Sequence, residues 1–309
     1  MRILVTGGAG FIGGHLVDAL LAAGHEVAVL DDLSTGRREN LPAGARLHVA
    51  SVATAAAEAA VLAERPEAIF HLAAQVDAAR SLAEPLLDTE VNVLGTVRLL
   101  AAAAAAGVPR FVLASSAAVY GDPTVFPTDE AEPHRPLSPY GIAKSAAERY
   151  LESFARDRGL TGVALRFANV YGPRQTALGE AGVVAVFCRR LLAGAPLTIH
   201  GDGRQTRDFV HVADVVAACL AALGAPSGAW HVATGVESDI LTVAAELRRH
   251  LAPEARIVHA TPRPADPRRS VLSPDLAAGQ LGFRARIPLA AGLERTAAWF
   301  RSHPEGNVR

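Results

Sequence analysis

The segment Thr6-Gly7-Gly8-Ala9-Gly10-Phe11-Ile12-Gly13 sets the architecture of this chain. It follows a short apolar run over residues 2–6 and opens a stretch with helical periodicity over residues 11–23, so it predicts a tight turn between a strand and a helix. Glycine at positions 7, 10 and 13 permits that turn and lets the main chain approach a pyrophosphate closely. The free N–H groups at the start of the helix would then face the anion. A glycine trio alone is weak evidence, but strand, turn and helix together are typical of a dinucleotide-binding unit.

An acidic residue closes the second predicted strand, residues 26–31, about 20 residues further on, as such a unit requires. Asp31 can accept hydrogen bonds from the hydroxyl groups of an adenosine ribose and would repel a 2′-phosphate, so NAD is expected rather than NADP. Arg37 and Arg38 stand close by in the sequence and keep NADP open as an alternative. The cofactor contacts expected from this part of the chain are Gly7, Gly10, Phe11, Ile12, Gly13, Asp31 and Asp32.

Strands and helices continue to alternate beyond this unit. Short apolar runs over residues 69–72, 111–114 and 162–167 are separated by Ala-rich helical stretches. This order predicts an α/β fold with a doubly wound parallel sheet, the Rossmann fold, whose strands end along one ligand-binding edge. From about Asn169 loops rich in Gly and Pro separate shorter helices. We therefore expect a dinucleotide-binding domain over residues 1–168 and a smaller α/β substrate-binding domain over 169–309, with the segment 207–235 able to return to the first domain.

The composition excludes several classes of protein. Of 309 residues, 50% are hydrophobic and 20% are charged, which favours extensive burial over disorder. The net charge is −1 and no basic stripe indicates nucleic acid as a partner. No apolar stretch of about 18 residues predicts a membrane span, and the glycines after Thr6 exclude a signal peptide. Two cysteines, Cys188 and Cys219, fit a reducing cytoplasm, and no His or Cys cluster predicts a metal site.

Tyr140-Gly-Ile-Ala-Lys144 carries the sharpest catalytic signal. Positions i and i+4 share one helix face, and Ser138-Pro139 is typical of a helix start. A free phenol has a pKa of about 10. Because a nearby ammonium favours the phenolate, we expect Lys144 to lower the pKa of Tyr140 and make it a general base. An exposed surface pair would have the same spacing, but Lys144 is the only lysine among the 30 lysines and arginines of the chain.

Small hydroxyl groups follow the predicted strand 111–114 and should lie at the carboxyl edge of the sheet. There Ser116 could hydrogen-bond a substrate oxygen that is being oxidised. A solvated turn serine is the alternative interpretation.

These features together resemble the extended short-chain dehydrogenase/reductase family, of the NAD-dependent epimerase/dehydratase type, and most closely its UDP-glucose 4-epimerase-like members. The resemblance covers nearly the whole chain. It implies that Tyr140 is the base, Lys144 its partner and Ser116 the hydroxyl that positions the substrate. Further matching stretches are His71-Leu-Ala-Ala-Gln75, Asn92-Val-Leu-Gly-Thr96, Leu165-Arg-Phe-Ala-Asn-Val-Tyr-Gly-Pro-Arg174, Gly179-Glu-Ala-Gly-Val-Val184, Gly201-Asp-Gly-Arg-Gln-Thr-Arg-Asp-Phe-Val-His211 and Arg263-Pro-Ala-Asp266.

The resemblance also implies contacts with ligands and a partner. Arginine forks suit a diphosphate, and a carboxylate suits the donors of a ribose or a base. A homodimer is implied by analogy, through helices at about 85–106 and 138–158. The NAD contacts implied are Ser51, Val52, Leu72, Ala73, Ala74, Gln75, Asn92, Tyr140 and Lys144, and the UDP-sugar contacts implied are Ser116, Asn169, Val183, Arg207, Arg263 and Asp266.

Two departures from the family pattern affect the ligands. Many relatives have an Asp after the third strand, where it meets the adenine amino group, but this chain has Ser51, so NAD should be held less tightly. Some 4-epimerases have a bulky Tyr after the Arg-x-x-Asp motif, where this chain has Ser270. The smaller side chain would leave room for N-acetylated hexosamines.

Several reactions in this family share one first step, in which Tyr140 removes the proton of the sugar 4-hydroxyl while a hydride moves to NAD⁺. A 4,6-dehydratase or a UDP-glucuronate decarboxylase needs a further acidic residue after the Ser-Ser element, but Ala117 and Ala118 stand there. A glucuronate 4-epimerase would carry an Arg at position 176, where this chain has Thr176. The expected function is therefore a UDP-hexose 4-epimerase acting on UDP-glucose and UDP-galactose. A 4,6-dehydratase, a glucuronate 4-epimerase and a silent dinucleotide sensor are the alternatives.

Overall fold

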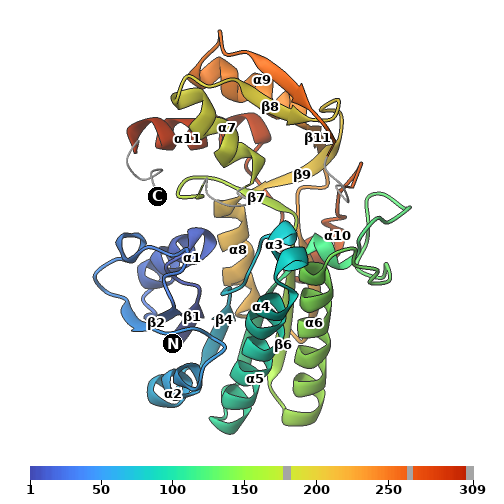
Figure 1. Ribbon diagram of the computed structural model, residues 1–309. Helices are drawn as coiled ribbons and strands as arrows, with labels where there is room; N and C mark the ends of the chain where they lie inside the picture. The colour runs from blue at the N-terminus through green and yellow to red at the C-terminus, as the bar shows by residue number, and fades with distance from the viewer. Residues whose placement is uncertain (177–181, 263–266, 304–309) are drawn as a thin grey trace.

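A seven-stranded parallel sheet forms the base of the molecule (Figure 1), in a computed structural model that describes residues 1–176, 182–262 and 267–303. The strand order is β10-β6-β5-β4-β1-β2-β3, and every pairing between neighbours is parallel. The predicted doubly wound sheet is thus confirmed. The strands are β1 (Arg2–Thr6), β2 (Glu26–Asp31), β3 (Arg46–Val49), β4 (Ala68–His71), β5 (Arg110–Ser116), β6 (Thr161–Phe167) and β10 (Gly228–Val232).

Helices cover both faces of this sheet, because its central strands are apolar on both sides. In β1 the side chains of Ile3 and Val5 join the core on the face covered by α1 and α8, whereas Leu4 joins the core under α2, α5 and α6. The N-terminus of α6 follows the predicted signals, with Ser138 as its cap and Pro139 as its first residue. These helices are α1 (Phe11–Ala22), α2 (Ala55–Glu64), α5 (Gly95–Ala105), α6 (Pro139–Arg158) and α8 (Val212–Ala222).

The segment before α5 is less regular than one continuous helix. Two short helices, α3 (Ala78–Ala83) and α4 (Pro85–Thr89), precede a π-helical turn over Glu90–Leu94, which runs directly into α5. The helix expected over about 85–106 therefore contains a π turn. This turn lies against α6 and places Asn92 inside the protein, where it is buried.

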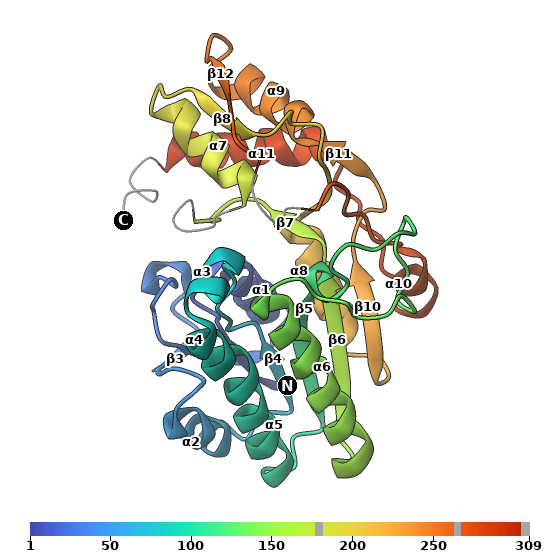
Figure 2. The ribbon, with the colours of Figure 1, turned by 45° about the vertical axis from the view of Figure 1, so that its right-hand side comes forward.

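A smaller unit lies above the carboxyl edge of the sheet (Figure 2). It has its own apolar core, which contains Phe187, Leu197, Leu247 and Phe300. It is built on a three-stranded sheet, β11-β9-β7, and a two-stranded sheet, β12-β8. Its elements are β7 (Asn169–Tyr171), α7 (Val183–Leu192), β8 (Leu197–His200), β9 (Thr206–His211), β11 (Glu237–Asp239), α9 (Ile240–Leu251), β12 (Ile257–Ala260) and α11 (Leu289–Ser302).

The chain passes between the two units more than once. After β9 it enters α8, which packs against α1, and β10 then adds the edge strand next to β6. The short helix α10 (Asp275–Gln280) later packs against β10. The division at residues 168 and 169 stays a prediction, and these contacts support assigning α8 and β10 to the dinucleotide-binding part. Within the described residues no helix is long and apolar enough to cross a membrane.

Candidate active site

The glycine turn between β1 and α1 forms a cradle that larger residues would fill. Gly7 has a φ of +68°, and a Cβ there would lie 2.6 Å from the main-chain nitrogen of Ala73. A Cβ on Gly13 would lie 2.0 Å from the carbonyl oxygen of Gly7. Gly10 caps α1, and no side chain caps its first turn. The turn therefore presents main-chain N–H groups at the positive end of a helix, which fits the pyrophosphate of NAD.

Asp31, the last residue of β2, is tied to that cradle. Its carboxylate accepts hydrogen bonds from the main-chain nitrogens of Ala9 (2.9 Å) and Leu33 (2.9 Å). Leu33 has a φ of +59°, a strained conformation that the bond to Asp31 helps to hold. Burial raises the pKa of Asp31, and these main-chain donors oppose the shift. Asp31 is therefore fixed at the sheet edge where an adenosine ribose is expected, while Asp32 is exposed and bonds Ser34 (2.9 Å).

A buried histidine links the first strand to α5. The Nδ1 atom of His71 lies 2.7 Å from the Thr6 hydroxyl, and its Nε2 atom lies 2.9 Å from the Thr96 hydroxyl. Because Thr96 donates its proton to the Asn92 carbonyl oxygen (2.7 Å), it must accept from Nε2, which places the His71 proton on Nε2. Burial and then Lys144 lower the pKa of His71 to about 3, so it stays neutral. Thr6 in turn accepts from the main-chain nitrogen of Ala73 (3.2 Å).

Asn92 clamps the main chain that follows β4. Its Oδ1 atom accepts from the Gln75 nitrogen (3.0 Å) and its Nδ2 atom donates to the Gln75 carbonyl oxygen (2.8 Å). Nδ2 also donates to Asp88 (2.9 Å), and so does Nε2 of Gln75 (2.9 Å). Asn92 and Gln75 thus fix the main chain just beyond β4, where the resemblance implies contacts with NAD. Their contact with the cofactor stays a prediction, as it does for Leu72, Ala73 and Ala74.

The three expected catalytic residues come from two adjacent elements. Ser116 ends β5, while Tyr140 and Lys144 lie one turn apart in α6, which packs against β5. The ammonium of Lys144 lies 5.8 Å from the centre of the Tyr140 ring and donates to the carbonyl oxygen of Ala114 (2.9 Å). The hydroxyl of Ser116 acts to lower the pKa of Tyr140, which favours the phenolate.

One electrostatic expectation was wrong. Lys144 was expected to lower the pKa of Tyr140, but burial raises that pKa to about 12, Ser116 opposes the rise, and the charge of Asp88 adds to it. The physical reason is that the ammonium of Lys144 donates to the Ala114 carbonyl oxygen, while burial of the phenol and the charge of Asp88 both disfavour the phenolate. Burial also lowers the pKa of Lys144 to about 8, with Asp88 and then Glu148 opposing the shift.

Residues outside the predicted set hold α6 in place. Ser81 in α3 accepts a hydrogen bond from the Tyr140 main-chain nitrogen (3.2 Å), and Ser138 accepts from the Gly141 nitrogen (3.2 Å). Both serines satisfy free N–H groups of the first helical turn. The Ser138-Pro139 signal predicted one of these contacts. No sequence signal identified Ser81, which reaches α6 from another helix.

A buried ion pair lies one helical turn beyond Lys144. Glu148 binds Arg166 of β6 through two nitrogens (2.7 and 3.0 Å) and accepts a hydrogen bond from Ser115. Arg166 also donates to the Tyr120 hydroxyl (2.6 Å), which lies 2.6 Å from Nε2 of His231 in β10. The network joins α6 to three strands. The only sequence signal for it was Arg166 inside an otherwise apolar strand.

Apart from Ser116, which ends β5 of the large sheet, the predicted UDP-sugar contacts that the structure describes lie in the smaller unit. β7 pairs with β9, which brings Asn169 opposite Phe209, two residues after the buried Arg207. Val183 begins α7 and is half-buried. Arg263 and Asp266 lie outside the described residues. Ser51 and Val52 follow β3 at the cofactor edge, and the Ser51 hydroxyl accepts from the Ala53 nitrogen (3.3 Å).

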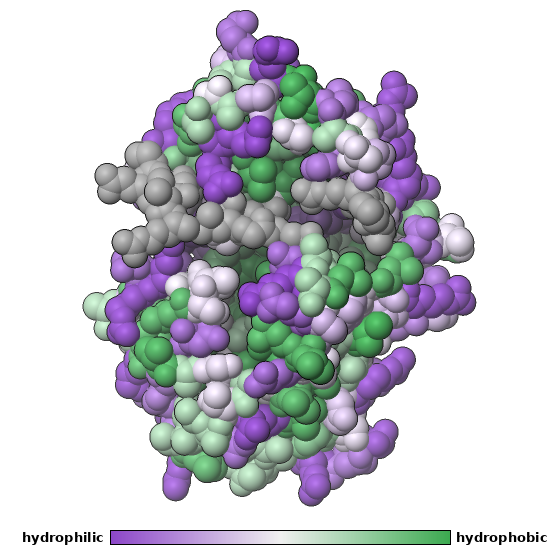
Figure 3. Space-filling model, viewed as in Figure 1, coloured by the Kyte–Doolittle hydropathy of each residue, from purple (hydrophilic) through white to green (hydrophobic). Residues whose placement is uncertain are grey.

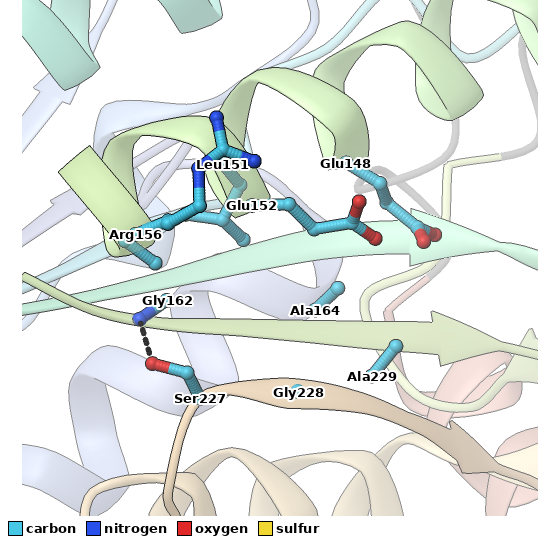
Figure 4. Close-up of a pocket in the computed structure, with 10 residues that line it drawn as sticks. Glu148, Leu151, Glu152, Arg156, Gly162, Ala164, Ser227, Gly228 and Ala229 are labelled. Carbon is cyan, nitrogen blue, oxygen red and sulfur yellow. Dashed lines mark hydrogen bonds between the residues drawn. The ribbon is translucent and has the colours of Figure 1, made fainter.

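A separate groove of about 340 Å³ lies between α6 and the strands β6 and β10 (Figure 4). It is lined by Glu148, Glu152 and Arg156 on the helix, and its floor contains small residues such as Gly162 and Ala229. None of the predicted cofactor or substrate residues lines it. We therefore do not assign it to the reaction.

A family model and a relative of known name both match most of this chain. The family model described as the NAD dependent epimerase/dehydratase family matches residues 3–233. A UDP-glucose 4-epimerase of Mycolicibacterium smegmatis is 46% identical over 312 residues, covering 98% of this chain and 99% of the relative.

Solved structures are equally similar. The UDP-glucose 4-epimerase of Thermotoga maritima, solved with UDP-glucose, has a TM-score of 0.96 and 42% identity, covering 98% of this chain and 100% of that one. The UDP-glucose 4-epimerase of Thermus thermophilus, in complex with NAD, has a TM-score of 0.93 and 43% identity, covering 97% and 99%.

Proposed function

The chain belongs to the NAD-dependent epimerase/dehydratase family, and from that premise we propose that it inverts C4 of a UDP-hexose, interconverting UDP-glucose and UDP-galactose. The observation that carries the proposal is the joint placement of Ser116, Tyr140 and Lys144 at the end of β5 and the start of α6. The glycine turn follows β1 of the same parallel sheet, so both lie at its carboxyl edge. The similar proteins described above are UDP-glucose 4-epimerases, and this supports inversion at C4 as the reaction.

In the proposed reaction each protein group has a distinct task. The Ser116 hydroxyl orients the 4-oxygen of the sugar, and the Tyr140 phenol removes a proton from that oxygen and later returns it. Lys144, held by the Ala114 carbonyl oxygen, keeps a positive charge close to the phenol. Bound NAD⁺ would supply the acceptor and later the donor of the hydride, and its positive charge would favour the phenolate. The net redox change is zero.

Within the described residues, the turn after Ser116 lacks the carboxylate that a related reaction needs. Ala117 and Ala118 form a 3₁₀ turn directly after Ser116, so no carboxylate stands there to eliminate water from C5 and C6. This supports epimerisation over 4,6-dehydration. Ser270 hydrogen-bonds β9 through its main chain (2.8 Å to the Asp208 nitrogen) and leaves a small side chain near Arg207, which supports including N-acetylated sugars among the substrates tested.

The test is an incubation of purified protein with UDP-glucose, UDP-galactose, their N-acetyl forms and UDP-glucuronate, without added reductant, and NMR identification of the products. We expect a C4-inverted product from at least one neutral sugar. A 4-keto-6-deoxy product would replace the proposal with a dehydratase, and conversion of UDP-glucuronate alone would replace it with a uronate epimerase.

We also propose that the protein is a homodimer that packs through α4, the π turn and α6. These three elements contact one another and carry exposed apolar side chains: Leu86, Leu94, Ile142 and Tyr150. Figure 3 shows apolar residues gathered over this part of the surface. Analytical ultracentrifugation should give a dimer for the parent and a monomer for Ile142→Glu. Val236→Glu, which changes an equally exposed apolar residue elsewhere, should remain dimeric.

The location proposed for the protein is the cytoplasm. Both cysteines, Cys188 and Cys219, are buried free thiols in the structure. A chain with free thiols and no disulfide within the described residues fits a reducing compartment.

A further inference from the structure

Asp88 is a buried carboxylate close to the catalytic helix. It lies in α4, which packs against α6, and it is 1% exposed. Sequence reasoning did not single it out, because an isolated Asp in a polar stretch is usually a surface residue. An ionised group buried this deeply is costly unless charges and hydrogen bonds compensate it, so its partners indicate its task.

The hydrogen bonds of Asp88 come from neutral amides. Its Oδ1 atom accepts from Nδ2 of Asn92 and from Nε2 of Gln75, both at 2.9 Å. Asn92 in turn holds the main-chain N–H and carbonyl of Gln75, just beyond β4. The carboxylate of Asp88 therefore anchors the side chain of Asn92, which holds the main chain at Gln75.

Asp88 and Lys144 are buried groups of opposite charge on two helices, α4 and α6, that pack together. Lys144 is 4% exposed and donates to a neutral carbonyl, that of Ala114. Glu148, the other acid near Lys144, is already bound by Arg166 through two nitrogens. Burial raises the pKa of Asp88, and its two amide donors and Lys144 oppose that rise. Asp88 and Glu148 are the acids that act on Lys144 among the described residues, and Glu148 is the one in an ion pair with an arginine.

We propose that Asp88 is a positioning residue for the reaction proposed above: it holds the main chain after β4 through Asn92 and supplies the negative charge that balances Lys144. The inference rests on the proposed function for its role in turnover, but the charge balance itself is a property of the resting protein.

The protonation behaviour expected from this arrangement has a definite sign. Asp88 raises the pKa of Lys144 and also that of Tyr140. Three other groups are coupled to this pair: Glu148 and His71 interact with Lys144, and Ser116 interacts with Tyr140. Removing the charge of Asp88 should therefore move both pKa values downward.

The variant Asp88→Asn separates charge from hydrogen bonding. Because a single oxygen of Asp88 accepts both amide donors, the carbonyl oxygen of an asparagine can accept them in its place. Asp88→Ala loses the charge and the hydrogen bonds together. Asp157→Asn, which removes an exposed carboxylate near the far end of the same helix α6, is the matched control.

The single lysine of the chain allows a direct measurement without turnover. Protein labelled with [ε-¹³C]lysine should give one lysine resonance, which we expect to titrate near pH 8 in the parent. In Asp88→Asn the midpoint should fall by about 1 pH unit, and in Asp157→Asn it should not move. Equal midpoints in the parent and in Asp88→Asn would overturn the proposal.

Activity and cofactor retention complete the test. In Asp88→Asn both limbs of the plot of kcat against pH should shift to lower pH, and the affinity for NAD should be unchanged. In Asp88→Ala the affinity for NAD should also fall several-fold. Loss of activity in Asp88→Asn with an unshifted profile would mean that the charge has no part. If the parent inverts no sugar, the proposed function fails, and the lysine titration still decides the role of Asp88.

Discussion

Individual atoms at the start of α6 define what this site can do. Tyr140 and Ser116 come together because the N-terminus of α6 packs beside the end of β5. The surroundings of the phenol raise its pKa to about 12, so a nearby positive charge is needed before it can act as a base. Residue spacing alone does not reveal this rise in pKa. Spacing places Lys144 on the same face of α6 as Tyr140, but the direction of its ammonium depends on the carbonyl oxygen of Ala114 in strand β5.

Replacing the phenol tests its role most directly. Tyr140→Phe should lower kcat about 10³-fold, because the group that moves the proton is lost. NAD binding and the fold should be nearly unchanged, since the ring remains. Steady-state rates and NAD titration would show both effects. Tyr150→Phe, on an exposed face of the same helix, should keep the parental rate, and a Tyr140→Phe variant with near-normal activity would remove Tyr140 from the mechanism.

The cradle can be tested with one methyl group. Gly13→Ala places a Cβ 2.0 Å from the Gly7 carbonyl oxygen and 2.7 Å from the Gly8 Cα, so the turn must open and NAD binding should be lost. Isothermal titration with NAD would measure it. Gly279→Ala in α10 meets nothing within 4 Å and should keep NAD affinity, while the fold gains about 0.5–1 kcal/mol. Parental affinity in Gly13→Ala would exclude the turn as the pyrophosphate site.

At the scale of helices and strands, local sequence predicted the regular parts and missed the joints between elements. The strand end at Asp31 and the start of α6 followed from an apolar run, a cap and a proline. Strand β5 continues to Ser116, two residues beyond the end of the predicted run 111–114. The π turn before α5 was not predicted. It carries Asn92, whose side chain binds Gln75, a residue 17 positions earlier in the chain and outside the helix. The pairing of Glu148 with Arg166 likewise depends on packing between α6 and β6.

The cap of α6 is expected to stabilise the whole catalytic helix. Ser138→Ala removes the hydroxyl that accepts from the Gly141 nitrogen and should cost about 1 kcal/mol of unfolding free energy. Urea denaturation would measure this. Ser153→Ala, whose hydroxyl makes an exposed contact with Asp157 (3.1 Å), should change stability by less than about 0.5 kcal/mol. Equal losses in the two variants would show that the cap adds nothing.

For the molecule as a whole, three buried histidines make stability depend on pH. Burial lowers the pKa of His71 to about 3, and those of His211 and His231 to about 4, below the ordinary value of 6.5. Between about pH 6.5 and 4 the unfolded chain therefore binds protons that the folded protein does not, so stability falls as pH falls. Each histidine contributes at most about 1.4 kcal/mol per pH unit.

Denaturant unfolding at pH 7.5, 6 and 5 would measure that dependence. The free energy of unfolding should decrease with acid, and His231→Gln should weaken the dependence, since one of the three groups no longer titrates. His303→Gln, an exposed histidine at the end of α11, should leave the slope as it is. A flat profile from pH 7.5 to 5 would contradict the assignment of neutral buried imidazoles.

The repeated passage of the chain between its two units has a consequence for its genetic dissection. A fragment ending at residue 168 would lack β10 and α8, so it would expose the edge of β6 and the face of α1 that these elements cover. The nucleotide half is thus not contiguous in the gene. Recombination at a single junction after residue 168 would therefore join the first six strands of one protein to an edge strand and a covering helix from another.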